Sequence, residues 1–116
     1  DSGSFRFHYQ SPVTPDTVYD YDLKTKKLTQ RKRQALNGGL DPTQYETARI
    51  AATAADGTRI PITLVYKKGL HADVAHPNPT LLYGYGSYGI SIPLTFSSER
   101  FSLLQRGVVF ALVLKY

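Results

Sequence analysis

Tyrosines on a glycine-spaced loop are the residues of this sequence whose types and spacing best suit chemistry. The apolar residues Leu81 and Leu82 lead into the loop, and residues 83–89 read YGYGSYG. Glycine adopts backbone conformations that residues with a Cβ resist, so such a loop can turn an aromatic hydroxyl toward a bound group. Tyr85 lies between two glycines after an expected strand, where α/β sheets place their sites. A neutral phenol is a proton donor at pH 7, and a donor aimed at a developing oxyanion stabilises a tetrahedral intermediate.

The same loop partly matches two other motifs, and its context disfavours both. Residues 84–89 fit the dinucleotide-binding pattern G-x-G-x-x-G, but in that motif the helix begins within the loop, whereas residues 90–93 delay it here. No acidic residue follows Glu99 to hold a ribose. Ser87 would be the nucleophile of a G-x-S-x-G elbow, but Tyr85 stands where that motif needs its first glycine. We therefore interpret Ser87 as a turn residue.

The histidines form no recognisable metal site. His71, Asp73 and His76 lie in a proline-containing stretch, at a spacing that matches no standard ligand set. We interpret this stretch as a surface loop and expect neither a metal nor another cofactor. A complete set of nucleophile, base and acid cannot be assembled from the residues present.

Length and composition indicate part of a larger protein. The 116 residues begin at Asp1, contain no methionine and end just beyond the apolar run of residues 108–114, which is typical of a strand buried on both faces. No apolar run is long enough to span a membrane, so we expect no membrane partner. The absence of cysteine fits a cytoplasmic protein, which is our expectation for its location.

The net charge of +5 is concentrated in one short stretch. Aromatic residues do not interleave with these charges as stacking on bases requires, so we interpret the stretch as a solvated hairpin and expect no nucleic-acid partner. The alternative is a non-catalytic β-rich interaction module whose basic hairpin binds acidic partners. The basic residues are Lys24, Lys26, Lys27, Arg31, Lys32 and Arg33.

Residues 1–40 and 41–116 are expected to form two units. The first has alternating strands at 4–9, 17–23 and 28–36, with prolines interrupting them at 11–16, and resembles a propeller blade in needing neighbours. Paired glycines and an Asp-Pro step near residue 40 mark the boundary. Strands at 49–54 and 59–66 then form a hairpin about Asp56-Gly57, and Pro61 predicts an edge position for the second of them.

The remainder of the second unit predicts an α/β fold. Residues 67–79 form a loop, and a strand at 80–83 leads into the glycine-tyrosine loop. A helix over 98–106 follows, with Ser97 or Ser98 as its cap, Phe101 and Leu104 on its apolar face, and Gly107 after its end. A buried strand ends the chain, so the order strand, helix, strand predicts a right-handed parallel crossover.

These segments resemble the prolyl oligopeptidase family of serine peptidases, in particular its oligopeptidase B branch, over nearly the whole chain. The loop LYGYGSYG at 82–89, followed by FSSER at 96–100 and LLQRG at 103–107, is the most specific match. Residues 9–22 resemble the segment that ends the family's β-propeller. Residues 56–66 resemble the strands that enter its α/β-hydrolase domain.

The resemblance implies a fragment: 1–40 would be the end of the β-propeller and 41–116 the N-terminal part of the α/β-hydrolase domain. It implies that Tyr85 is the oxyanion-hole tyrosine and that Tyr88, Gly86 and Ser87 bind substrate. The family cleaves short peptides by acyl transfer, and this branch cleaves after Arg or Lys. The triad lies outside these 116 residues, which are expected to be inactive alone and to need the remaining hydrolase domain and propeller to fold. The family continues differently where this chain reads Leu114-Lys115-Tyr116.

Overall fold

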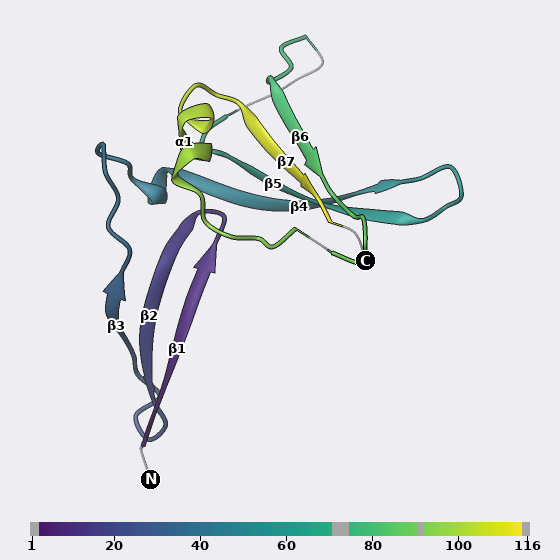
Figure 1. Cartoon of the computed structure of the whole chain (residues 1–116). Helices are drawn as coiled ribbons and strands as arrows, with labels where there is room; N and C mark the ends of the chain where they lie inside the picture. Colours follow the sequence, from purple (N-terminus) through teal and green to yellow (C-terminus); the bar gives the residue numbers. More distant parts are fainter. Residues whose placement is uncertain (1–2, 71–74, 91, 115–116) are drawn as a thin grey trace.

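The chain forms two β-sheets and one short α-helix in a computed structural model that describes residues 3–70, 75–90 and 92–114 (Figure 1). The first sheet has the order β1-β2-β3, and the second has the order β4-β5-β7-β6. The elements are β1 Ser4–Ser11, β2 Thr14–Asp22, β3 Leu28–Arg33, the 3₁₀ turn η1 Pro42–Gln44, β4 Tyr45–Thr53, β5 Arg59–Lys67, β6 Thr80–Gly84, α1 Ser98–Leu104 and β7 Val109–Val113.

One carboxylate on the central strand of the first sheet is hydrogen-bonded to arginines on both neighbouring strands. The Asp20 carboxylate on the central strand accepts hydrogen bonds from Arg6 Nε at 2.7 Å and Arg6 Nη2 at 3.0 Å on β1, and from Arg31 Nε at 2.7 Å on β3. These charge-assisted bonds hold the pKa of Asp20 well below its usual range. All three strands of this sheet are thereby connected through one side chain.

The predicted hairpin of the second sheet is confirmed. β4 and β5 pair antiparallel from Tyr45 opposite Lys67 to Thr53 opposite Arg59. The turn between them has Gly57 at φ +85°, and the Asp56 carboxylate accepts the Thr58 N–H at 2.9 Å. A positive φ is cheap for glycine, which explains why this Asp-Gly pair encodes the turn.

The edge position predicted from Pro61 is wrong, because β5 lies between β4 and β7. The β5–β7 pairing extends from Ile62 to Val65, and Pro61 is the next residue outward. Its carbonyl accepts the Leu114 N–H at 3.1 Å, so Pro61 faces β7 at the point where the ladder ends. A missing donor is tolerated there without breaking a central hydrogen bond.

Helix α1 packs its apolar face on the second sheet as expected. Phe101 and Leu104 are buried, and the Phe101 ring meets the Tyr45 ring edge-on at a centroid distance of 4.7 Å. Gly107 has φ +82° and lets the chain reverse after the helix, while the Val108 N–H reaches the Leu103 carbonyl at 3.3 Å. The buried cluster is Tyr45, Val65, Phe101, Leu104, Phe110 and Leu112.

Several predicted boundaries differ from the structure. β2 begins at Thr14 and includes Pro15, so the proline-containing stretch does not separate the strands as expected. The helix ends at Leu104, two residues earlier than predicted, and Ser97 holds its N-cap position without a side-chain hydrogen bond. β3 ends at Arg33. Part of the predicted 67–79 loop, at 71–74, lies outside the described residues.

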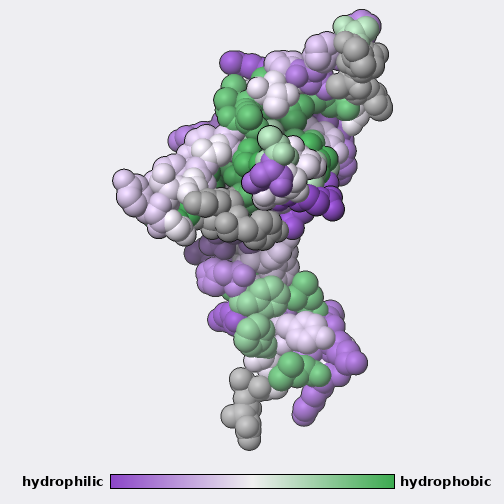
Figure 2. Space-filling model, turned by 90° about the vertical axis from the view of Figure 1, so that its right-hand side faces the viewer, coloured by the Kyte–Doolittle hydropathy of each residue, from purple (hydrophilic) through white to green (hydrophobic). Residues whose placement is uncertain are grey.

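The molecule is open. Its radius of gyration is 17.4 Å, whereas a compact domain of this length has about 13 Å. Large apolar side chains are exposed on both sheets, among them Phe5, Leu28, Leu81 and Leu82, and Figure 2 shows apolar surface on the upper and lower parts of the molecule. Within the described residues no helix is long and apolar enough to cross a membrane.

We expect Asp20→Asn to remove an acid-dependent part of the first sheet's stability. Because the folded pKa of Asp20 is depressed, its stabilisation is complete above the ordinary aspartate pKa near 3.9 and is lost as the pH falls through the lowered value. Circular dichroism during acid titration should show a shallower loss in Asp20→Asn. Asp16→Asn is the control and should follow the wild type, because among the described side chains the Asp16 carboxylate has only the His8 ring as a partner, at 3.3 Å. Identical acid titrations of Asp20→Asn and wild type would contradict this role.

Candidate functional site

The glycine-tyrosine loop emerges where two parallel strands end together. β6 pairs parallel with β7 from Thr80 opposite Val109 to Gly84 opposite Val113, which confirms the parallel pairing predicted for these strands. A Cβ on Gly84 would lie 3.3 Å from the Val113 Cβ. Gly84 does not have a positive φ, so its role is to permit this close approach. The loop therefore starts close against the end of β7.

Two tyrosines on either side of Gly84 have different surroundings. The Tyr83 ring is 50% exposed and stacks on the Phe110 ring with centroids 6.3 Å apart, so one of its faces packs at the strand end. Tyr85 is 45% exposed, and its hydroxyl makes no hydrogen bond to another described residue. The Tyr85 phenol is therefore free to donate to a group that arrives from outside these residues.

Tyr88 lies on a tight turn in an uncommon backbone conformation. The Ile90 N–H donates to the Ser87 carbonyl at 3.0 Å, and the two central residues, Tyr88 and Gly89, have φ of 54° and 70°. Positive φ at both positions is the pattern of a type I′ turn, which Gly89 accommodates readily and a tyrosine only at some cost. The turn presents Tyr88 to solvent with 93% of its surface exposed. Ser87 is the first residue of this turn, and Gly86 connects it to Tyr85.

The described structure does not support the dinucleotide-binding motif or a metal site. α1 begins at Ser98, well after the loop at 84–89, so no helix N-terminus meets that loop as a dinucleotide site requires. The described residues contain no group of three or more His, Asp or Glu that could hold a metal ion. His71 and Asp73 of the histidine-containing stretch lie outside the described residues.

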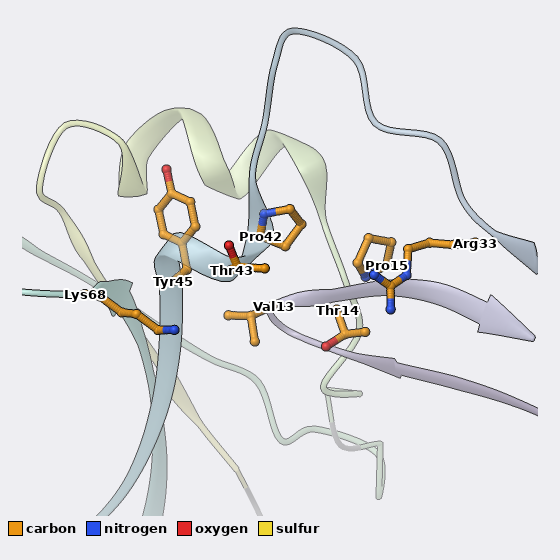
Figure 3. A pocket seen from close by; sticks show the side chains of 8 residues that line it. All are labelled: Val13, Thr14, Pro15, Arg33, Pro42, Thr43, Tyr45 and Lys68. Atoms are coloured by element: carbon orange, nitrogen blue, oxygen red, sulfur yellow. The ribbon is translucent and has the colours of Figure 1, made fainter. Parts of the chain in front are cut away.

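A cavity that the sequence did not predict lies between the two sheets (Figure 3). It has a volume of about 320 Å³. Arg33 at its wall donates from Nε to Thr17 Oγ1 at 3.1 Å, and burial raises the pKa of Tyr45 on the opposite side. Its residues come from four separate segments of the chain, so no local spacing signals them. They are Val13, Thr14, Pro15, Arg33, Pro42, Thr43, Tyr45 and Lys68.

Known proteins resemble the chain along almost its whole length, although no family model matches it. It is 47% identical to a dipeptidyl aminopeptidase BI from Pseudoxanthomonas mexicana over 92% of this chain and 14% of that protein. It is 33% identical to a protease 2 from Moraxella lacunata over 95% of this chain and 16% of that protein. The structure of oligopeptidase B from Trypanosoma brucei superposes with a TM-score of 0.79, at 39% identity, over 98% of this chain and 16% of that one.

The chain matches a fragment of the prolyl oligopeptidase family. It spans about a seventh of the length of the curated relatives, 14% and 16% for the two above. Its two-sheet, β-rich architecture matches the propeller end of prolyl oligopeptidase-family structures. Relatives in this family carry several names, including prolyl endopeptidase, so the resemblance to the oligopeptidase B branch is one of several.

We expect Gly84→Ala to destabilise the junction between β6 and β7. The added methyl meets Val113 at 3.3 Å, and overpacking of this kind costs about 1–3 kcal/mol. Urea unfolding of the protein measures the loss. The double variant Gly84→Ala/Val113→Gly should recover part of it, because the second change removes the Val113 Cβ that the added methyl meets. A double variant whose loss equals the sum of the two single losses would contradict the close-approach explanation.

Proposed function

We propose that this chain is the junction segment of a serine oligopeptidase, in which the Tyr85 hydroxyl donates to the oxyanion formed during acyl transfer. In this proposal residues 1–40 end a β-propeller, and residues 41–116 begin an α/β-hydrolase domain. The supporting observation is the position of Tyr85, which follows directly after the paired carboxyl ends of β6 and β7 and whose hydroxyl has no hydrogen-bond partner among the described residues. The 116 residues would contribute one donor to a site that other parts of the protein complete.

The topology of the second sheet supports a hydrolase role for its loop. In α/β hydrolases one oxyanion donor comes from the loop between the third strand and the first helix of the sheet. β4, β5 and β6 are the first three strands of this sheet along the chain, and α1 follows them. If β4, β5 and β6 correspond to those three strands, the loop that holds Tyr85 is the donor loop, which supports the proposal. A phenolic O–H can replace a backbone N–H as an oxyanion donor because either supplies one directed hydrogen bond.

The substrates in this proposal are short peptides, cleaved through an acyl-enzyme after Arg or Lys. Tyr88, Gly86 and Ser87 would line the approach to the scissile bond, and the exposure of the Tyr88 ring supports a contact role. Peptidases dominate the relatives, and the Trypanosoma brucei oligopeptidase B carries covalently bound antipain. The preference for basic residues rests on the resemblance to oligopeptidase B. The cytoplasmic location stays a prediction.

We expect Tyr85→Phe in the complete protein to lower kcat by roughly 10²- to 10³-fold with little change in KM. The phenylalanine keeps the ring and removes only the donor, so the loss falls on the transition state. Steady-state hydrolysis of a fluorogenic Arg-containing dipeptide measures both constants. Tyr83→Phe is the matched control, because its ring packs on Phe110, and it should retain kcat. An unchanged kcat in Tyr85→Phe would overturn the assignment.

The isolated 116 residues should associate or aggregate and should not hydrolyse peptides. Leu81 and Leu82 on the edge strand β6 are exposed, and an exposed apolar edge strand recruits other strands. Size-exclusion chromatography with light scattering measures the association. A sharp monomeric peak with cooperative melting would contradict the dependence on the remaining protein.

A second candidate function is an interaction module whose basic hairpin binds acidic partners. The observation in its favour is that β3 and the preceding turn are exposed throughout. Against it, the Arg31 guanidinium is engaged by Asp20 and the Arg33 guanidinium by Thr17 and Tyr19, so within the described part of the chain only the lysines of the hairpin lack a side-chain partner. Heparin affinity distinguishes the two. Salt-dependent retention that disappears in Lys24→Gln/Lys26→Gln/Lys27→Gln would favour the module.

A further inference from the structure

Arg100 is a half-buried cation whose contacts with the described residues use few of its hydrogen-bond donors. Its guanidinium carbon lies 4.4 Å from the centre of the Phe110 ring, and Nη1 donates to the Thr95 carbonyl at 3.3 Å. A guanidinium has five N–H donors in a fixed fork. Burial lowers the pKa of Arg100, which reflects loss of water without a compensating anion. Among the described residues no carboxylate forms an ion pair with it.

This arrangement is incomplete by the usual energetics of buried charge. Buried cations in proteins are ordinarily paired with an anion and hydrogen-bonded, because one ring face and one neutral carbonyl do not replace the lost hydration. The guanidinium also cannot escape the cost by losing its proton. The missing contribution is a planar, bidentate acceptor of negative charge, which is the geometry of a carboxylate.

A cavity beside Arg100 has room for such a group. Its volume is about 450 Å³, which accommodates several side chains. Tyr83 from β6, Phe110 and Leu112 from β7, and Leu103 from α1 supply an apolar wall. Glu99 also lines the cavity, but it is exposed and makes no ion pair with its neighbour among the described residues. The cavity therefore combines an apolar wall with one unmatched positive charge.

We propose that a segment of the remaining polypeptide packs into this cavity and presents an aspartate or glutamate carboxylate to Arg100. A polypeptide fits better than a small ligand, because on the same face of the sheet the apolar wall continues past Tyr83 to the exposed residue Leu81 of the edge strand β6. The curated relatives are about seven times longer than this chain, so most of the protein is available to supply the segment. The inference rests on the proposed function for the existence of that polypeptide, but not for its catalytic activity.

Hydrogen exchange of α1 in the complete protein tests the proposal. Arg100→Met keeps an aliphatic side chain over Phe110 and removes the positive charge. The proposed carboxylate would then be left in the cavity without a partner. At pH 7 the protection factors of the α1 amides should fall roughly 100-fold. At pH 4, where the stranded carboxyl is protonated, the difference from wild type should shrink to less than about 10-fold.

Glu99→Gln is the matched control, since it removes the other carboxylate at the cavity, and it should stay within about 3-fold of wild type at both pH values. Where Arg100→Met fails to accumulate, Arg100→Lys keeps the charge without the fork and should lose roughly 10-fold at pH 7. Wild-type protection in these Arg100 variants, or a loss equal at both pH values, would overturn the proposal in favour of plain packing. Added glutarate that raises α1 protection in wild type would overturn it in favour of a soluble carboxylate.

Peptidase activity is measured on the same samples and separates the two proposals. A pH-dependent loss of protection in a protein without peptidase activity would sustain the carboxylate contact and reject the proposed function. An active peptidase in which the Arg100 substitutions leave the protection of the α1 amides unchanged would sustain the proposed function and reject the carboxylate contact.

Discussion

The parallel pairing of β6 with β7 is the constraint on which the remaining structure depends. It is the one parallel pairing among the described strands, and it requires the chain to leave β6, pass through the tyrosine loop and α1, and return alongside. The return buries Phe110, Ala111 and Leu112 in the centre of the sheet. Because both strands run the same way, their carboxyl ends meet at one edge, and the loop that holds Tyr85 begins there. Gly84 makes this possible by letting the backbone of β6 approach Val113.

The charges of the two sheets contrast in how completely they are satisfied. In the first sheet one carboxylate, that of Asp20, accepts from two guanidinium groups and needs nothing further from outside. Beside the second sheet, Arg100 of α1 contacts the Phe110 ring and the Thr95 carbonyl but no anion among the described residues. Apolar side chains of β6, the edge strand of this sheet, are also exposed to solvent. Unmatched charge and exposed apolar area thus occur together, which is the pattern expected where other parts of a protein pack.

Local patterns in the sequence predicted most of the elements because each was encoded by nearby residues. The hairpin about Gly57, the helix with Phe101 and Leu104 on its apolar face, and the final buried strand follow from turn chemistry and periodicity. The prediction from Pro61 was wrong because a proline lacks one backbone N–H, which rules out one hydrogen-bonded position but not a central strand. Only the register of β7 shows that the β5–β7 hydrogen bonds end next to Pro61. The helix end was predicted two residues too late because Gly107 marks the point where the chain reverses direction, and the helix itself ends before it, at Leu104.

The candidate site was only partly accessible from sequence. The glycine spacing located the loop, but the exposure of Tyr85 and the left-handed backbone of Tyr88 depend on how β6 meets β7. The cavity between the sheets and the one beside Arg100 gather residues from distant segments, and no spacing along the chain encodes such contacts.

The most direct test of the central claim is a crystal structure of the complete protein with a peptide aldehyde that ends in arginine. Such an aldehyde forms a tetrahedral adduct with a catalytic serine, so its oxygen marks the position of the oxyanion. We predict that the Tyr85 hydroxyl lies about 2.7–3.1 Å from that oxygen. A Tyr85 ring packed against the sheet, with its oxygen beyond hydrogen-bonding distance of the adduct, would contradict it.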